Sequence, residues 1–261
     1  MQQLSKTIHH SDGVGIHTVS VIQKGTQPTL VFLPGMSGAA EEGARFFAPC
    51  VAQGFNIISM SFRGRGRSST PKEGYTLDDH ADDIELVIND SKCSQVILIA
   101  NSVSTLYAAQ YLLRERPTVV KGMVIVDHPL RASKFKKGWS DDFAKVEVRG
   151  KSVLNTMRMM AMDRIELESK AVDFYAAYEA LGVPTLVMTP HLSWVLLSKD
   201  DLVLFERQKR TKVVHFEKSD HFVRLCEPEK FLETVVGFAR GVSLVAHSPQ
   251  VNPYASLDVS E

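Results

Sequence analysis

Six short apolar runs, separated by segments of helical periodicity, are the feature of this 261-residue sequence that most restricts its fold. Each run is rich in Val and Ile and is apolar at consecutive positions, which is typical of strands buried on both faces of a parallel sheet. The runs fall at residues 29–33, 56–60, 95–100, 122–126, 185–188 and 212–216. Helical patterns lie at residues 41–53, 77–89, 103–116, 201–209 and 228–240. This alternation predicts an α/β fold with a mostly parallel, doubly wound sheet.

One stretch interrupts the alternation. Residues 128–182 contain helical patterns and no convincing strand, so we expect a helical cap inserted over the carboxyl ends of the strands, where ligands bind in such folds. The core would then comprise residues 1–127 and 183–261. The last helix is expected to begin at Pro228 and to end at Arg240, before Gly241, and the polar tail beyond it is expected to be loosely ordered.

The composition excludes several classes of function. Lys and Arg number 30 and Asp and Glu number 30, so the basic excess that nucleic-acid binding requires is missing. No apolar run approaches the ~18 residues of a membrane span, and the polar N-terminus does not resemble a signal peptide. The three cysteines, Cys50, Cys93 and Cys226, fit neither a metal spacing nor a disulfide framework. These features predict a cytoplasmic protein with neither a membrane span nor a metal site.

Ser102 stands where a buried strand meets a helix, in the segment ILIANSVST. A serine on such a turn is exposed above the sheet and can act as a nucleophile, provided that its neighbours at −2 and +2 are small. Ala100 and Ser104 meet that condition, although the usual residues are glycines. Ser104 fits worse as the nucleophile because Leu106 would crowd its own +2 position. The alternative is that Ser102 only caps the helix.

A glycine-containing turn, PGMSG, follows the first predicted core strand. Its backbone could face the hydroxyl of Ser102, and acyl transfer needs hydrogen-bond donors where negative charge develops. The N–H groups of Met36 and Val103 are therefore the candidate oxyanion hole. A plain Pro-Gly turn is the alternative.

His221 follows the last predicted strand by a short loop and precedes the last helix. The loop lies at the same end of the sheet as Ser102, so the imidazole could act as a general base toward its hydroxyl. A lone loop histidine is otherwise an ordinary surface residue.

Taken in order, these segments resemble the α/β-hydrolase family over roughly residues 12–241. The resemblance rests on LVFLPGMSG, SFRGRGRSS, ILIANSVST, VPTLVM and SDHFVRLCEPEKF. It implies an α/β-hydrolase fold, a Ser–acid–His triad, an oxyanion hole and a helical cap. It also implies that residues 63–68, RGRGRS, form a structural turn, and this segment has no Gly-Lys-Ser/Thr ending that would indicate a phosphate loop.

The acid of the implied triad has two candidates. Most family members carry it after the strand that here reads VPTLVM, where Ser193 stands at about the expected position. Asp200 follows later and resembles the first turn of a helix capped by Ser198. Asp127 ends the strand next to that of Ser102, the position used by many haloalkane dehalogenases and by cofactor-independent ring-cleaving dioxygenases. We therefore expect Asp127 to be the acid, with Asp200 as the alternative. The non-catalytic interpretation of Asp127 is that it only caps the loop after its strand.

Large apolar side chains of the cap and of the loop after residue 190 could bind substrate. The candidates are Trp139, Met157, Met160 and Trp194. Methionine adapts to irregular apolar surfaces, so Met157 and Met160 could form a flexible ceiling over Ser102. Ordinary packing between cap helices is the alternative.

The leading hypothesis is a hydrolase of the serine carboxylesterase type, which cleaves a carboxylic ester or related acyl substrate through an acyl-enzyme. It requires no cofactor and no metal, and its partner would be a small hydrophobic or aromatic acyl substrate; a homodimer remains an open alternative. Two rivals use the same scaffold. One is a cofactor-independent dioxygenase of a heteroaromatic ring, although that group carries His before the nucleophile and this chain has Asn101. The other is a non-catalytic ligand-binding relative.

Overall fold

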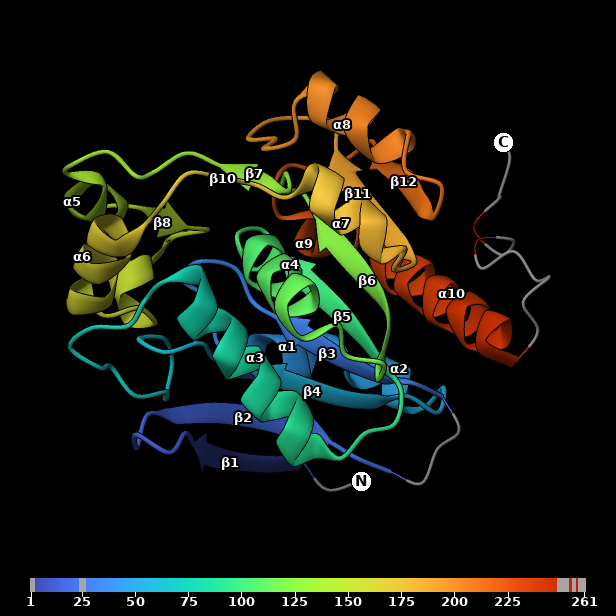
Figure 1. Ribbon diagram of the computed structural model, residues 1–261, viewed down its shortest axis with the longest axis horizontal. Coiled ribbons are helices and arrows are strands. Elements are labelled where there is room, and N and C mark those ends of the chain that lie inside the picture. The colour runs from blue at the N-terminus through green and yellow to red at the C-terminus, as the bar shows by residue number, and fades with distance from the viewer. Residues whose placement is uncertain (1–2, 24–26, 248–253, 255–256, 258–261) are drawn as a thin grey trace.

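An eight-stranded sheet with helices on both faces forms the centre of the computed structural model, which describes residues 3–23, 27–247, 254 and 257 (Figure 1). Its strands are β1 (Gln3–His9), β2 (Gly15–Val21), β3 (Thr29–Leu33), β4 (Asn56–Met60), β5 (Val96–Asn101), β6 (Val120–Val126), β11 (Thr185–Pro190) and β12 (Thr211–Phe216). Their order is β1-β2-β4-β3-β5-β6-β11-β12, and every pair from β4 to β12 is parallel. The predicted α/β fold with a mostly parallel sheet is confirmed.

The first two strands were not predicted. β1 and β2 form an antiparallel hairpin, and β2 also pairs antiparallel with β4. The sequence of β1, QLSKTIH, contains only two apolar residues, and the strand stays largely exposed because it lies at the edge of the sheet. A search for continuous apolar runs therefore misses it, since that pattern marks only strands buried on both faces.

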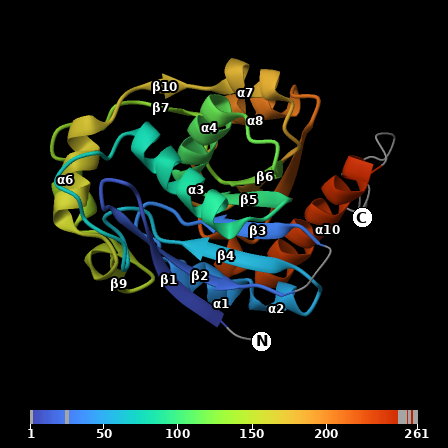
Figure 2. The same ribbon diagram turned by 60° about the horizontal axis from the view of Figure 1, so that its bottom comes forward.

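Helices cover the sheet in two layers, and each layer encloses its own apolar cluster (Figure 2). The first layer consists of α3 (Leu77–Ser91), α4 (Ser104–Glu115), α7 (Tyr175–Leu181) and α8 (Lys199–Glu206). The second consists of α1 (Ala40–Phe46), α2 (Ala48–Val51) and α10 (Pro228–His247), with the short α9 (Val223–Cys226) leading into α10. The helices therefore lie on both faces of the sheet, as a doubly wound topology requires.

Two predicted helix boundaries were wrong. The single helix expected at residues 41–53 is divided at Phe47, because Pro49 in the first turn of α2 has no N–H to continue the preceding helix. The last helix does not end at Arg240 but runs through Gly241 to His247. Beyond His247, the tail lies outside the described residues except at positions 254 and 257. Among the helices that the structure describes, none has the length and apolar character needed to cross a bilayer.

The segment 128–182 departs from the prediction that it contains only helices. It holds α5 (Trp139–Phe143), the 3-10 helix η1 (Val153–Asn155), α6 (Met159–Glu168) and α7. It also holds β7 (Arg131–Ala132) paired with β10 (Val172–Asp173), and β8 (Glu147–Val148) paired with β9 (Lys151–Ser152). Strands of two residues leave no run of apolar residues to recognise. Figure 1 shows α5 and α6 beside the sheet, on the side toward which the arrowheads of β4 and β6 point.

A buried ion pair anchors the loop between β4 and α3. Arg63 donates from Nη2 to Oδ1 of Asp83 at 2.6 Å and from Nε to Oδ2 at 3.0 Å. His10, from the turn between β1 and β2, lies with Nε2 3.0 Å from the same Oδ1. Burial opposes ionisation of Asp83, but the hydrogen bonds of His10 and Arg63 hold the pKa of its carboxyl below the usual range. One carboxylate therefore fastens three separate segments.

We expect Asp83→Asn to lower the free energy of unfolding by about 3–5 kcal/mol, because it removes the buried carboxylate of Arg63 and leaves only the longer contact, at 3.3 Å, to the partly exposed Asp79. Asp82→Asn is the matched control on the same helix. Asp82 pairs with Arg114 at 2.6 Å but both side chains are partly exposed, so its loss should cost at most about 1 kcal/mol. Urea denaturation of both variants measures the difference, and equal losses would contradict the assignment.

Candidate active site

Ser102 occupies a tight turn between β5 and α4. Its φ is +58°, in the left-handed region that residues with a side chain rarely adopt. Its N–H donates to the carbonyl of Val126 at 2.9 Å, and its own carbonyl accepts from the N–H of Thr105 at 2.9 Å. These two bonds join the turn to the neighbouring strand and to the helix. They hold a strained serine at the carboxyl edge of the sheet, as a strand-to-helix nucleophile turn requires.

The two residues that replace the usual glycines pack under this turn, and one of them forms hydrogen bonds to it. Ala100 and Ser104 are fully buried. The hydroxyl of Ser104 donates to the carbonyl of Leu33 at 2.8 Å and lies 2.9 Å from the carbonyl of Asn101. A glycine could not make these contacts. Ser104 therefore links the end of β3 to the turn that carries Ser102.

His221 lies between Ser102 and Asp127. It belongs to the loop that joins β12 to α9. Its Nε2 is 3.1 Å from Oγ of Ser102, and its Nδ1 is 2.7 Å from Oδ2 of Asp127. A carboxylate facing a ring nitrogen accepts a hydrogen bond from it, so Nδ1 carries the hydrogen and Nε2 is left to accept from the serine hydroxyl.

Asp127 is the acid that reaches His221. It directly follows β6, its side chain is fully buried, and its φ is +46°. The backbone N–H groups of Leu196 and Leu197 donate to its carboxylate at 3.1 and 3.2 Å. Its own N–H donates to the carbonyl of Met188 at 3.0 Å. The carboxylate is thus held by two main-chain donors as well as by the imidazole.

The other aspartates have different partners. Asp200 is exposed in the first turn of α8, and Ser198 caps that helix as the sequence indicated. Asp201 belongs to the same capping box and pairs with Arg131 at 2.8 Å. Asp220, next to His221, accepts from the N–H of Phe222 at 2.8 Å. Of the two acids that the sequence left open, only Asp127 is hydrogen-bonded to His221.

The candidate oxyanion donors lie on the two sides of Ser102. A Cβ built on Gly35 would stand 3.3 Å from Cβ of Ser102, so the turn containing Met36 presses against the serine. Val103 follows Ser102 at the N-terminus of α4, where the helix dipole favours negative charge. Within the described chain, the N–H groups of Met36 and Val103 have no protein acceptor. Both remain available to a developing oxyanion.

The four candidate substrate-binding residues do not form one surface. Trp139 stacks between Phe135 and Phe143, with ring centroids 4.1 and 5.0 Å away. It packs against an apolar cluster that includes Met157, which is fully buried, and Met36 packs against the same cluster. Met160 and Trp194 are instead exposed, by 40% and 68%. Trp139 and Met157 thus share a cluster with the candidate oxyanion turn, whereas Met160 and Trp194 lie apart from it.

Two features near the site were not recognised in the sequence. The first is the pair of main-chain donors at Leu196 and Leu197, which no residue pattern reveals because any residue supplies an N–H. The second is a buried contact between Arg65 and His80, with Nη1 of Arg65 2.8 Å from Nε2 of the imidazole. The segment RGRGRS was interpreted as a turn, and nothing in its pattern indicates the partner of Arg65.

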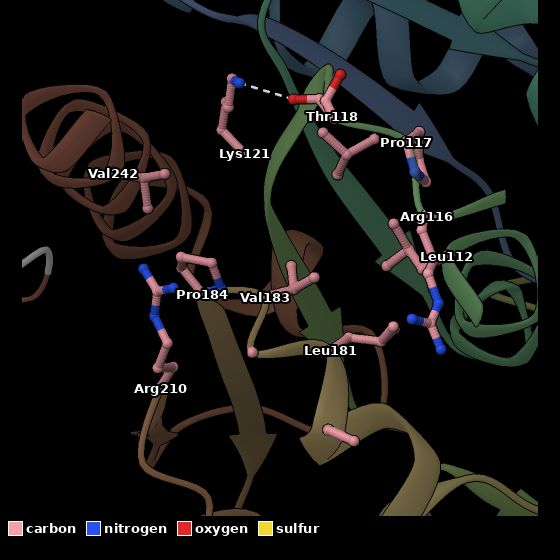
Figure 3. A pocket seen from close by; sticks show the side chains of 13 residues that line it. Leu112, Arg116, Pro117, Thr118, Lys121, Leu181, Val183, Pro184, Arg210 and Val242 are labelled. Carbon is pink, nitrogen blue, oxygen red and sulfur yellow. Dashed lines mark hydrogen bonds between the residues drawn. The ribbon is translucent and has the colours of Figure 1, made fainter. Parts of the chain in front are cut away.

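A cavity of about 560 Å³ lies away from this site (Figure 3). Its walls include Val120 and Lys121 at the start of β6 and Pro184 just before β11, whereas Asp127 follows the end of β6. It therefore opens at the opposite end of the strands from Ser102. Among the described residues, His, Cys, Asp and Glu side chains form no group of three that could hold a metal ion.

Comparison with known proteins finds similarity to one fold family. A family model described as the alpha/beta hydrolase fold matches residues 28–161, which include Ser102 and Asp127. A 2-(acetamidomethylene)succinate hydrolase from Mesorhizobium japonicum is 30% identical over 121 residues. The match covers 44% of this chain and 40% of that protein, so this chain spans less than half the length of that curated relative.

Solved structures share the fold over nearly the whole chain. An esterase from Exiguobacterium antarcticum superposes with a TM-score of 0.74 at 21% identity, covering 91% of this chain and all of the other. A loop variant of a haloalkane dehalogenase from Bradyrhizobium elkanii gives a TM-score of 0.75 at 16% identity, covering 95% and 99% of the two chains. At such identities the likeness shows the fold alone, and that fold is the one that the sequence resemblance implied.

The buried imidazole of His80 should make stability depend on pH. Burial, reinforced by the charge of Arg65, lowers the pKa of His80 from its ordinary 6.5 to about 3. Between these values the unfolded chain binds a proton that the folded protein excludes, so the free energy of unfolding falls as the pH falls. The slope should approach about 1.4 kcal/mol per pH unit for this one group. Denaturation from pH 7 to pH 4 should show a shallower slope in His80→Gln than in the wild type, and equal slopes would contradict this origin.

Proposed function

Because this chain belongs to the α/β-hydrolase fold family, we propose that it is a serine hydrolase that cleaves a carboxylic ester or a related acyl compound. The arrangement that carries the proposal is the imidazole of His221 in hydrogen-bonding distance of both Ser102 and Asp127. The Mesorhizobium japonicum relative is a hydrolase, which supports the same reaction class.

In the proposed reaction, Oγ of Ser102 attacks the acyl carbon while Nε2 of His221 takes the hydroxyl proton. The carbonyl oxygen becomes negatively charged and accepts hydrogen bonds from the N–H groups of Met36 and Val103. His221 then gives its proton to the leaving alcohol as the bond to the acyl carbon breaks, which leaves the acyl group on Ser102.

Water completes the cycle. His221 removes a proton from a water molecule as the water oxygen attacks the acyl carbon. His221 then gives that proton to Oγ of Ser102 when the carboxylic acid leaves. Throughout, Asp127 holds the proton of His221 on Nδ1 and stabilises the imidazolium. Its two main-chain donors, Leu196 and Leu197, keep the carboxylate directed at the ring.

The proposed substrate has a hydrophobic or aromatic acyl group. Met36 packs against the apolar cluster around Met157, so an apolar surface adjoins the proposed oxyanion turn. Trp194, exposed on the loop that supplies the donors to Asp127, offers a separate apolar surface, with its ring 6.4 Å from that of Phe222 beside His221.

A fluorophosphonate probe should label the protein at Ser102 and abolish its esterase activity, because the probe reacts with a serine that a neighbouring base activates. Mass spectrometry of the tryptic peptide locates the label, and Ser102→Ala is the control that should remain unlabelled. Folded wild-type protein that stays unlabelled would contradict the proposal. Oxygen uptake with a heteroaromatic substrate, in the absence of ester turnover, would indicate the cofactor-free oxygenase instead.

Asp127→Asn should lower kcat toward p-nitrophenyl esters by about 10⁴-fold, because the amide stabilises the wrong tautomer of His221. Asp200→Asn is the matched control, since Asp200 is exposed on α8 and has no contact with His221. It should keep kcat within a factor of about two, as surface changes usually do. A large loss of kcat in Asp200→Asn and not in Asp127→Asn would instead identify Asp200 as the acid.

A further inference from the structure

Arg65 lies in the loop between β4 and α3, and only 1% of its surface is exposed. It contacts the turn that follows β3. Its Nε donates to the carbonyl of Met36 at 3.0 Å. Its Nη1 donates to the carbonyl of Arg63 at 2.7 Å and to Nε2 of His80 at 2.8 Å. Its Nη2 has only weak acceptors, the hydroxyl of Tyr107 at 3.4 Å and the thioether of Met36 at 3.6 Å.

The charge of Arg65 is not neutralised by a neighbour. Arg63 pairs with Asp83, and Arg67 pairs with Glu41 at 3.0 Å, but Arg65 forms no ion pair within the part of the chain that the structure describes. A buried cation without a counter-charge costs several kcal/mol, so folding stability alone gives no reason for it. An apolar side chain of similar size would pack there at lower cost.

His80 fixes the direction in which Arg65 points. Its Nδ1 lies 2.7 Å from the carbonyl of Thr76 and donates to it, which leaves the lone pair of Nε2 for Arg65. The ring stacks on Tyr107, with centroids 4.0 Å apart and planes inclined by 14°. Since the imidazole stays neutral, it accepts from the guanidinium rather than repelling it.

The turn that contains Met36 also forms hydrogen bonds with a second segment. Thr156, from the segment 128–182, donates from its hydroxyl to the carbonyl of Ser37 at 2.5 Å. Gly66, next to Arg65, donates to the carbonyl of Thr156 at 2.6 Å. Met36 is therefore fixed through its own carbonyl and through its neighbour, and Gly35 packs against Ser102.

We infer that Arg65 is a positioning residue for acyl transfer, whose guanidinium locks the Met36 turn and supplies an uncompensated positive charge that stabilises the oxyanion. This role rests on the proposed function. A fixed charge and a fixed N–H need no reorganisation as the oxyanion forms, so they lower the transition-state energy more than the ground-state energy. A merely structural arginine would change stability without a selective effect on kcat.

The test compares Arg65→Met, Arg65→Lys and the control Arg67→Gln, whose arginine is exposed two residues further along the loop. With p-nitrophenyl acetate, Arg65→Met should lower kcat by up to about 10²–10³-fold, the loss that follows removal of an oxyanion donor, because the Met36 N–H would no longer be held in place; KM should change less than about twofold. Its rate of labelling by fluorophosphonate should fall in parallel. Arg65→Lys should recover part of kcat, because it keeps the positive charge but lacks the several fixed donors of the guanidinium. Arg67→Gln should have the kcat of the wild type.

The outcomes separate the two proposals. A wild type that is inactive and unlabelled would refute the serine hydrolase itself. An active, labelled wild type whose folded Arg65→Met variant keeps kcat within threefold, or loses activity through KM alone, would refute the role of Arg65. If Arg65→Met does not fold, Arg65→Lys decides: a kcat within twofold of the wild type refutes the role, and a tenfold loss at unchanged KM supports it.

Discussion

The arrangement of the site depends on two left-handed backbone residues at the carboxyl ends of neighbouring strands. Ser102 follows β5 with φ +58°, and Asp127 follows β6 with φ +46°. Each conformation carries a steric cost, and each is fixed by a main-chain bond to the adjacent strand, to Val126 for one and Met188 for the other. Bonds to the sheet thus hold both turns in place. The imidazole of His221, from a third loop, lies between the two side chains and contacts both.

How far the sequence predicts this molecule depends on the range of each interaction. The strands at residues 29–33 and 56–60 were predicted to the residue, because apolar β-branched runs bounded by polar residues are local signals. Strand β1 was missed because it lies at an edge of the sheet and is mostly polar. Topology alone placed Ser102, Asp127 and His221 at one end of the sheet. The donors at Leu196 and Leu197 and the pairing of Arg65 with His80 could not be predicted, since they depend on how separate loops meet in space.

Two arginines two residues apart illustrate how differently one loop can use the same side chain. Arg63 is neutralised by Asp83 and fastens the hairpin, the loop and α3 together, which is a contribution to stability. Arg65 contacts only neutral acceptors and reaches the turn beside Ser102. The composition of the loop, RGRGRS, does not distinguish these environments, whereas the position of each guanidinium relative to α3 and to Met36 does.

The loop that carries Leu196 and Leu197 holds the buried carboxylate through its main chain, while Leu192, Trp194 and Leu196 project into solvent. The exposed side chains of this loop take no part in the bonds that its main chain makes to the carboxylate of Asp127. Mutation can therefore alter the solvent-facing surface beside the site without releasing that carboxylate.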